Sequence, residues 1–183
     1  MRSIRLKQQV ACWLGFACVA AGAPRGLWLD VPYVKQPRDG CGAACILMVL
    51  EYWVQKDPQF HCTLPPVESI QRTLFSSKAR GIYARDMERY LRQHGLRVFV
   101  FRGDSSALEE HLARGRPLIV CLREGWGLDR TLHYVVVAGL DPARDLVLVN
   151  DPERGKLAAF HGAHFEKQWR GENCWTLLAL PRS

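Results

Sequence analysis

The feature that most constrains this chain is the stretch QPRDGCGAACILMVLEYW, residues 36–53 of 183. Every residue from 43 to 50 is apolar, and Glu51 is the first charge after them. Alanine, leucine and methionine favour helix, and an apolar run without a polar face is typical of a helix buried on nearly all sides. We expect this helix to end near Gln55, before the Asp-Pro pair at 57–58. The rest of the fold must therefore surround it.

Helical spacing dominates the first half of the chain and strand patterns dominate the second. Helices are predicted at 66–75, at 84–94 with Gly95 as the stop, and from Ser106 to Gly115, where Ser106 and Glu109 form a capping-box signature. A short extended segment is expected at 27–34, a hairpin turn at 141–145, and strands at 96–101, 117–122, 132–140, 145–151, 156–160 and 174–180. This order predicts an α+β fold with an antiparallel sheet.

Residues 1–23, MRSIRLKQQVACWLGFACVAAGA, have the layout of a secretory signal peptide. Cationic residues precede an apolar run of about 14 residues, whereas a membrane-spanning helix needs roughly 20. We predict cleavage after Ala23, with Ala20 or Ala21 as alternatives. The mature protein is then one domain, residues 24–183, long enough to bury a sizeable core and located in the periplasm or secreted.

The residues before Cys18 argue against a lipid anchor, and the charge distribution argues against nucleic-acid binding. A lipoprotein is disfavoured, because Gly15 stands three residues before Cys18, where a bulky aliphatic residue is expected. The formal net charge is +7, and loss of the three cations in residues 1–23 would leave +4. The basic residues are scattered, so we expect no nucleic-acid partner and no stable membrane insertion after signal removal. We expect a monomer that binds a peptide or protein substrate.

Cys41 is the strongest candidate for a reactive residue. It stands between Gly40 and Gly42 at the start of the buried helix, where backbone N–H groups stabilise a thiolate. We expect the two glycines to let a substrate backbone approach closely. The alternative is that Cys41 is one more small residue of the core, for which glycines on both sides would have no use.

A thiol nucleophile needs a base and a group that orients the base. His133 begins a strand-like segment and is the candidate base, because a rigid central strand can fix its position. Asp151 ends the next strand and is the candidate orienting group. Asp151 precedes Pro152, so turn formation is its alternative role. Asn150 competes with Asp151, since an amide also orients an imidazole.

Gln36 is the candidate oxyanion donor. It precedes Cys41 by five residues, so its side-chain NH₂ and the backbone N–H of Cys41 could bind a tetrahedral oxygen together. Without the other three residues, Gln36 would be read as an ordinary loop glutamine.

Metal and redox chemistry are weaker alternatives. His61 and Cys62 are adjacent and two further histidines, at 161 and 164, are three apart, yet these spacings do not build a closed zinc site. The CxxxC at 41 and 45 is not the CxxC of a disulfide oxidoreductase. We expect no cofactor and no metal. Five cysteines remain after residue 23, an odd number that suggests a free thiol without predicting any pairing.

Three segments of the chain resemble the bacteriocin-processing, double-glycine-leader cysteine peptidase family, a papain-like group. They are VPYVKQPRDGCGAACILMVL, GIYARDMERYLRQHGL, and HYVVVAG with LVNDPERG. The resemblance implies a helical N-terminal half and an antiparallel-sheet C-terminal half with the active-site cleft between them. It also implies that Cys41 is the nucleophile, His133 the base, Asp151 its orienting residue and Gln36 the oxyanion residue.

The chain departs from the best-known members, which are fused to ABC exporters and cut after Gly-Gly in the cytoplasm. It has no transporter segment, and its glutamine lies five rather than six residues before the cysteine, as in freestanding exported relatives. We therefore predict an exported cysteine endopeptidase whose cleavage specificity the sequence does not define. The alternatives are a non-catalytic peptide-binding module on the same fold and another thiol acyl-transfer enzyme, such as an amidase or a transglutaminase-like protein.

Overall fold

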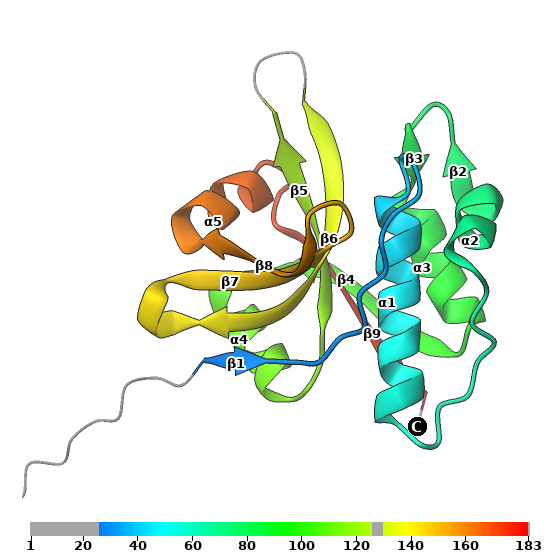
Figure 1. Ribbon diagram of the computed structural model, residues 1–183, viewed down its shortest axis with the longest axis horizontal. Coiled ribbons are helices and arrows are strands. Elements are labelled where there is room, and N and C mark those ends of the chain that lie inside the picture. The colour runs from blue at the N-terminus through cyan, green and yellow to red at the C-terminus, as the bar shows by residue number, and fades with distance from the viewer. Residues whose placement is uncertain (1–25, 126–129, 183) are drawn as a thin grey trace, which may run out of the picture.

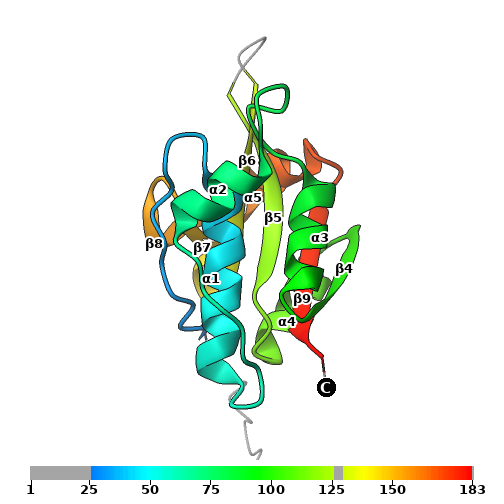
Figure 2. The same ribbon diagram turned by 90° about the vertical axis from the view of Figure 1, so that its right-hand side faces the viewer.

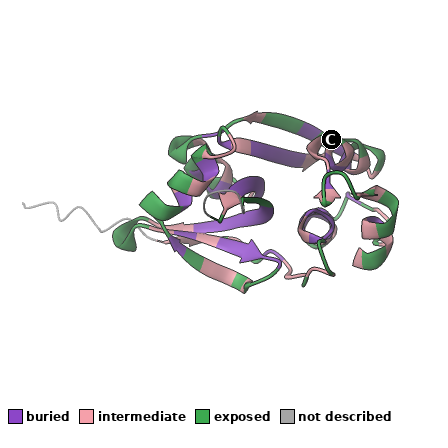
Figure 3. Cartoon of the chain, turned by 90° about the horizontal axis from the view of Figure 1, so that it is seen from above, coloured by how far each residue is buried: buried purple, intermediate pink, exposed green. Residues whose placement is uncertain are grey.

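The computed structural model describes residues 26–125 and 130–182 of the chain. The signal-peptide prediction for residues 1–23 lies outside these residues. Within them, the predicted buried helix is α1 (Cys41–Lys56), and eleven of its residues are buried. Figure 3 shows this helix end-on, surrounded by other elements. Two of its aromatic residues satisfy their polar atoms on distant backbone: Tyr52 Oη donates to Gly115 O at 2.7 Å, and Trp53 Nε1 to Ala179 O at 2.8 Å.

Two shorter helices and a small hairpin complete the helical half of the molecule. Helices α2 (Val67–Leu74) and α3 (Ala84–Gln93) confirm the predictions at 66–75 and 84–94, and both pack on α1. Between them, β2 (Phe75–Ser76) and β3 (Gly81–Ile82) pair as an antiparallel hairpin that the sequence analysis missed. Two-residue strands are too short to show an alternating pattern. Figure 2 shows these helices in front of the large sheet.

The other half is built on one large antiparallel sheet (Figure 1). Its strands follow the order β4-β9-β5-β6-β7-β8, and β1 pairs with β6 as a seventh strand. The six predicted strands are all present, and the extended segment at 27–34 contributes only β1. The bounds are β1 Leu27–Trp28, β4 Leu96–Arg102, β5 Leu118–Glu124, β6 Thr131–Asp141, β7 Leu146–Asp151, β8 Gly155–His161 and β9 Trp175–Pro181.

The turn between β6 and β7 is a short 3₁₀ helix, η1 (Pro142–Arg144), at the predicted hairpin position. Helix α4 (Ser105–Ala113) is also where a helix was expected, but the capping-box prediction is wrong. Asp104 is the N-cap and its Oδ1 accepts from Ala107 N at 2.8 Å, while Ser106 Oγ donates to the same oxygen. Aspartate and serine are equally good N-cap residues. Because Asp104 caps the helix, the helix starts at Ser105 and Ser106 lies inside its first turn.

Helix α5 (Gly162–Arg170) was not predicted, and it places a helix in the half that was expected to hold strands only. Phe165 and Trp169 stand one turn apart and are its two buried residues. Together with α4, it covers the face of the sheet opposite α1, as Figure 1 shows. The α+β class and the separation into a helical part and an antiparallel-sheet part are nevertheless confirmed.

Strand β6 divides the core into two parts because its side chains alternate between the faces of the sheet. Tyr134, Val136 and Ala138 belong to the cluster around α1. Val135 and Val137 belong to a second cluster that includes residues of α4 and α5. In the part of the chain that the structure describes, no helix has the length and apolar character needed to cross a membrane.

Candidate active site

Cys41 is the first residue of α1, directly after a tight turn. Gly40 N donates to Pro37 O at 2.9 Å, and Asp39 has a left-handed φ of 54°. Gln71 of α2 holds the turn from outside, because its Nε2 donates to Asp39 O at 3.1 Å. Gly40 is the N-cap and has no side chain with which to cap the helix, and the first turn has no acidic residue. The backbone amides at this helix end therefore remain free to stabilise a thiolate.

The packing around Cys41 requires glycine on both sides of it. A Cβ on Gly40 would lie 2.6 Å from ring carbons of Pro37. A Cβ on the buried Gly42 would lie 3.2 Å from Ile82 Cβ and 3.3 Å from Met87 Cε. Both glycines thus leave room for the protein's own turn and core.

His133 and Asp151 form a buried pair at one end of the sheet. His133 Nε2 lies 2.8 Å from Asp151 Oδ1, and the Cys41 thiol is close enough to the same imidazole to help raise its pKa. Because Nε2 is engaged by Asp151, Nδ1 is the nitrogen that remains for Cys41. The sheet half thus brings a histidine and a carboxylate to the thiol at the start of α1.

The electrostatics of this pair favour its charged form. Burial alone would lower the pKa of His133, but its hydrogen bonds and charge attraction to Asp151 and Cys41 outweigh burial and raise that pKa to about 10. Burial likewise opposes ionisation of Asp151, yet the hydrogen bond and positive charge of His133, with the N–H groups of Glu153 and Arg154, lower its pKa to about 2. At neutral pH the pair is therefore an imidazolium and a carboxylate.

Asn150, the competing orienting residue, lies on the other face of the sheet. Its Nδ2 donates to Val31 O at 2.9 Å and its Oδ1 accepts from Leu157 N at 3.0 Å. These bonds tie the chain before α1 and strand β8 to β7. Asn150 is fully buried in this structural role, and the geometry leaves the contact with His133 to Asp151 alone.

Two charged residues that the sequence analysis did not single out complete this cluster. Arg154 Nη1 donates to Asp151 Oδ2 at 3.0 Å and to Glu124 Oε1 at 2.8 Å. The hydrogen bond that Arg154 donates to Glu124 is the main cause that raises the pKa of Arg154. Arg154 lies in the segment LVNDPERG, three residues after Asp151, so its position in the sequence was the available signal.

Gln36 lies at the edge of the same region. Its N–H donates to Pro152 O at 3.0 Å, an oxygen that also accepts from Tyr33 Oη at 3.2 Å. The loop before Cys41 is thereby fixed to the residue that follows Asp151. Within the described residues, the side-chain Oε1 of Gln36 is buried without a hydrogen-bond partner.

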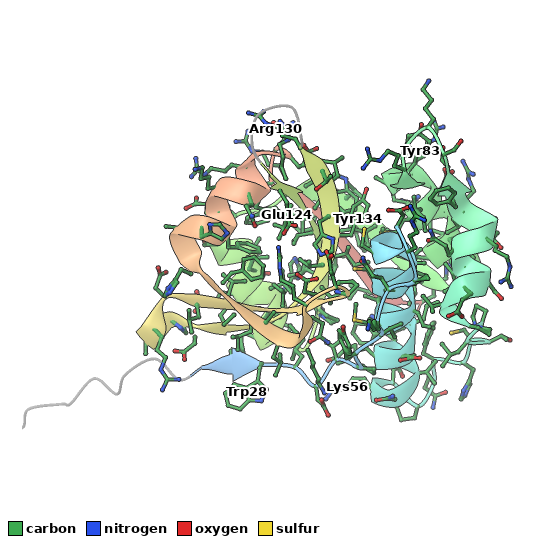
Figure 4. All side chains as sticks on the ribbon, turned by 45° about the horizontal axis from the view of Figure 1, so that its top comes forward. Trp28, Lys56, Tyr83, Glu124, Arg130 and Tyr134 are labelled. Carbon is green, nitrogen blue, oxygen red and sulfur yellow. The ribbon has the colours of Figure 1, made fainter. Side chains whose placement is uncertain are left out.

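Two hollows meet at Cys41. We call the first the polar hollow: it has a volume of about 430 Å³, and its lining includes Gln36, Asp39, Glu124, Thr131, His133 and Glu153. We call the second the apolar hollow: it has a volume of about 690 Å³, and its lining includes Gly81, Ile82, Tyr83, Cys121, Tyr134 and Trp175. Figure 4 shows Tyr134 on the sheet and Tyr83 on the helical half, with Glu124 beside the β5–β6 hairpin. The cleft therefore lies between the two halves of the fold.

Cys45 and Cys121 differ from Cys41 in their surroundings. All five cysteines in the described part of the chain are free thiols. Cys45 and Cys121 are buried, and burial is the main cause that raises the pKa of each thiol well above its ordinary value. Both thiols are therefore protonated and unreactive near neutral pH. Among the described residues, no group of three or more His, Cys, Asp and Glu side chains is placed to hold a metal ion.

A thiol at the N-terminus of a buried helix, beside a histidine–carboxylate pair on an antiparallel sheet, is the arrangement of papain-like cysteine peptidases. Comparison with known proteins agrees with this class. Residues 28–175 match the model of the Peptidase_C39 like family. The chain therefore belongs to the Peptidase_C39 like family. Among curated protein sequences, none matches the chain significantly.

Solved structures of peptidase domains share the fold. A double-glycine-motif protease from an AMS/PCAT transporter, solved with its leader peptide, has 23% identity and a TM-score of 0.60, covering 85% of this chain and 94% of that one. The peptidase domain of Streptococcus ComA, a bifunctional ABC transporter involved in quorum sensing, has 19% identity and a TM-score of 0.65, covering 83% and 99%. A C39-like peptidase candidate from Bacillus anthracis has 16% identity and a TM-score of 0.58, covering 87% and 100%. This likeness confirms the papain-like α+β fold.

Proposed function

We propose that this protein is a cysteine endopeptidase that works through an acyl-enzyme. The family and the fold support cysteine peptidase activity in general. The assignment of catalytic roles rests on the position of the His133 imidazole, which lies beside both Asp151 and Cys41. His133 contacts the Asp151 carboxylate at 2.8 Å, and it lines the same hollow as Cys41, whose thiol helps to raise the pKa of the imidazole.

Acylation begins with the Cys41 thiolate attacking the carbonyl carbon of the scissile peptide. The carbonyl π electrons move to its oxygen, and the backbone N–H of Cys41 with the Gln36 side-chain NH₂ bind that oxyanion. As the oxygen electrons return, the C–N bond breaks and the leaving nitrogen takes the proton from the His133 imidazolium. A thioester on Cys41 and a neutral His133 remain.

Deacylation reverses the role of His133. The neutral imidazole takes a proton from water, and the resulting hydroxide attacks the thioester carbon. Collapse of the second tetrahedral intermediate breaks the C–S bond, releasing the acid product and the Cys41 thiolate beside His133 imidazolium. Asp151 accepts a hydrogen bond from Nε2 throughout, which holds the ring with Nδ1 toward the thiol.

The activity is tested by profiling the purified protein on a diverse peptide library. We expect cleavage that Cys41→Ala abolishes while the fold is kept. Cys45→Ala is the matched control, because Cys45 is buried one turn further along the same helix, and it should retain most of the turnover. A non-catalytic peptide-binding module would bind library members without cutting them. An amidase or transglutaminase-like enzyme would act on side-chain or small amides instead.

We further propose that the protein is exported and acts in the periplasm or outside the cell. The support is the sequence pattern of residues 1–23, with cations followed by an apolar run and small residues. N-terminal sequencing of protein from the native host should find a start at or close to Pro24. An intact Met1 on the abundant form would contradict export.

A further inference from the structure

The direction of the substrate in the cleft follows from the position of His133. The imidazole must reach the leaving nitrogen to protonate it, so the leaving-group side of the substrate lies where His133 lies. His133 lines the polar hollow, and it is not among the residues lining the apolar hollow. Cys41 lines both. The acyl side of the substrate, which precedes the scissile bond, is therefore directed into the apolar hollow.

The walls of the apolar hollow are suited to a large apolar side chain. From the sheet, Tyr134 and Trp175 present aromatic rings that meet edge to face, with centroids 5.5 Å apart and planes at 65°. From the helical half, Ile82 and Tyr83 form the opposite wall. A volume of about 690 Å³ falls within the roughly 300–1,000 Å³ that ligand sites occupy.

The hollow also has charged residues in its lining: Glu172, and the exposed Arg80 and Arg102. Val100 and Leu132 also line the hollow, and they remain 40% and 54% exposed, so an apolar ligand would bury surface that is otherwise in water. Glu172 is the acidic residue in the lining. Its charge is compensated, because Arg123 Nε donates to its Oε1 at 2.6 Å. An apolar side chain in the hollow would cover exposed apolar surface without burying an uncompensated carboxylate.

We propose that the apolar hollow binds one bulky apolar side chain, leucine-sized or aromatic, from the two substrate residues that precede the scissile bond. This specificity rests on the proposed peptidase function. It differs from cleavage after two glycines, because a Gly-Gly pair has no side chain with which to fill the hollow. Burial of the side chain places the scissile carbonyl beside Cys41.

The test compares matched peptides that differ only at the last two positions of the acyl side. The series carries Gly-Gly, Phe-Gly, Gly-Phe or Leu-Gly there, and one further peptide carries Gly-Gly with the Phe moved to the leaving side. We expect kcat/KM to be at least about 10-fold higher for one of the peptides with an acyl-side Phe or Leu, the discrimination that filling an apolar pocket provides. Equal or faster cleavage of the Gly-Gly peptide would overturn the proposal.

A pocket-filling variant locates the effect. Gly81 lines the hollow, its φ is not in the left-handed region, and a Cβ there would meet nothing closer than Ala79 O at 3.9 Å. Gly81→Leu should therefore fold and should lower kcat/KM for the preferred peptide about 10-fold or more. Ala113→Leu, a similar increase in size at an exposed position of α4, should leave it unchanged. No loss in Gly81→Leu would also overturn the proposal.

The two hypotheses fail in different ways. If no peptide in the series or in the library is cut although Cys41 reacts with iodoacetamide, the proposed peptidase function fails. If peptides are cut through Cys41 but without preference for an acyl-side apolar residue, the function stands and the specificity of the hollow is wrong.

Discussion

At the scale of single residues, the Asp151 carboxylate is the most heavily bonded group of the site. Its Oδ1 accepts from His133 Nε2, Glu153 N and Arg154 N, and its Oδ2 accepts from Arg154 Nη1. The carboxylate is completely buried, so these donors replace the water that would otherwise solvate its charge. This environment holds Asp151 ionised and fixes the direction in which it points at His133.

Asp151→Ala should lower kcat by roughly 100-fold or more, because His133 loses the partner that sets its tautomer and orientation. Asn150→Ala should lower kcat much less, since Asn150 bonds to Val31 and Leu157 instead of the imidazole. It should instead lower the thermal unfolding temperature, because it removes buried hydrogen bonds. Steady-state kinetics and thermal melts of both variants check this ranking, and the reverse ranking would move the orienting role to Asn150.

The pH dependence follows from the raised pKa of His133 and the lowered pKa of Asp151. The stability that His133 contributes is fully present below its ordinary pKa of 6.5 and is lost as pH rises through about 10. The contribution of Asp151 is present above its ordinary pKa of 3.8 and is lost as pH falls through about 2. We expect kcat/KM to stay high well above pH 6.5, and Asp151→Asn to move its alkaline limb to lower pH. An alkaline limb near 6.5 in the unmodified protein would contradict this account.

Arg154 is a positioning residue for Asp151. It is held in turn by Glu124 of β5, at 2.8 Å. Arg154→Ala should lower kcat about 10-fold with little change in KM, since a hydrogen bond between charged groups is worth about 1.5–3 kcal/mol and solvent reaches this side chain. It should also shift the alkaline limb downward, because Asp151 is then less firmly placed. Arg154→Lys should recover part of both losses. A change in KM alone would show that Arg154 contacts substrate instead.

At the scale of elements, a β-bulge in β6 selects Asp151 over Asn150. From the hairpin turn, Gly139 pairs with Leu148, but the register then shifts so that Val137 pairs with Val149 and Val136 with Asn150. Opposite residues share a face, so Asp151 comes to the face of His133. Without the extra residue, Ala138, the alternation would have brought Asn150 to that face.

Strand β1 supports this bulge. Leu29 N donates to Ala138 O at 2.7 Å, and Leu27 pairs with Leu140. A Cβ on Gly139 would lie 2.6 Å from Leu27 O and 2.8 Å from Trp28 Cβ, so only glycine allows β1 to approach. The bulge and the glycine therefore depend on each other.

Gly139→Ala should lower the free energy of unfolding by about 1–3 kcal/mol, because β1 must move away from β6. Its unfolding temperature should fall by several degrees, since about 1 kcal/mol corresponds to roughly 2–4 °C in a chain of this size. Gly81→Ala is the matched control and should change stability little, because a Cβ there has open space. Calorimetry of the two variants decides the matter, and equal melting temperatures would contradict the role given to Gly139.

The bulge also explains what the sequence could not predict. Local patterns were sufficient to predict the buried helix α1, the six strands and the four candidate site residues. They were not sufficient to decide between Asn150 and Asp151, because that choice depends on one residue of register in β6. Helix α5 was missed although Phe165 and Trp169 have helical spacing, since nine residues with two apolar positions give a weak periodic signal.

At the scale of the whole molecule, the site exists only where the two halves meet. The helical half supplies Cys41 at the start of α1, and the sheet half supplies His133 and Asp151 from neighbouring strands. The segment before α1 joins them, because Gln36 and Tyr33 both bond to Pro152 O. For Arg154 the sequence showed only its place three residues after Asp151, because its second partner, Glu124, comes from β5, 30 residues away.

The measurement that tests the central claim most directly is labelling of the folded protein at neutral pH with a thiol-directed peptide mimic, followed by mass spectrometry. We expect the mimic to modify Cys41 and to leave Cys45 and Cys121 untouched, because burial keeps those two thiols protonated. It also predicts that labelling slows in His133→Ala, which removes the imidazolium beside the thiolate. A folded protein in which Cys41 stays unlabelled, or reacts no faster without His133 than with it, would contradict the account.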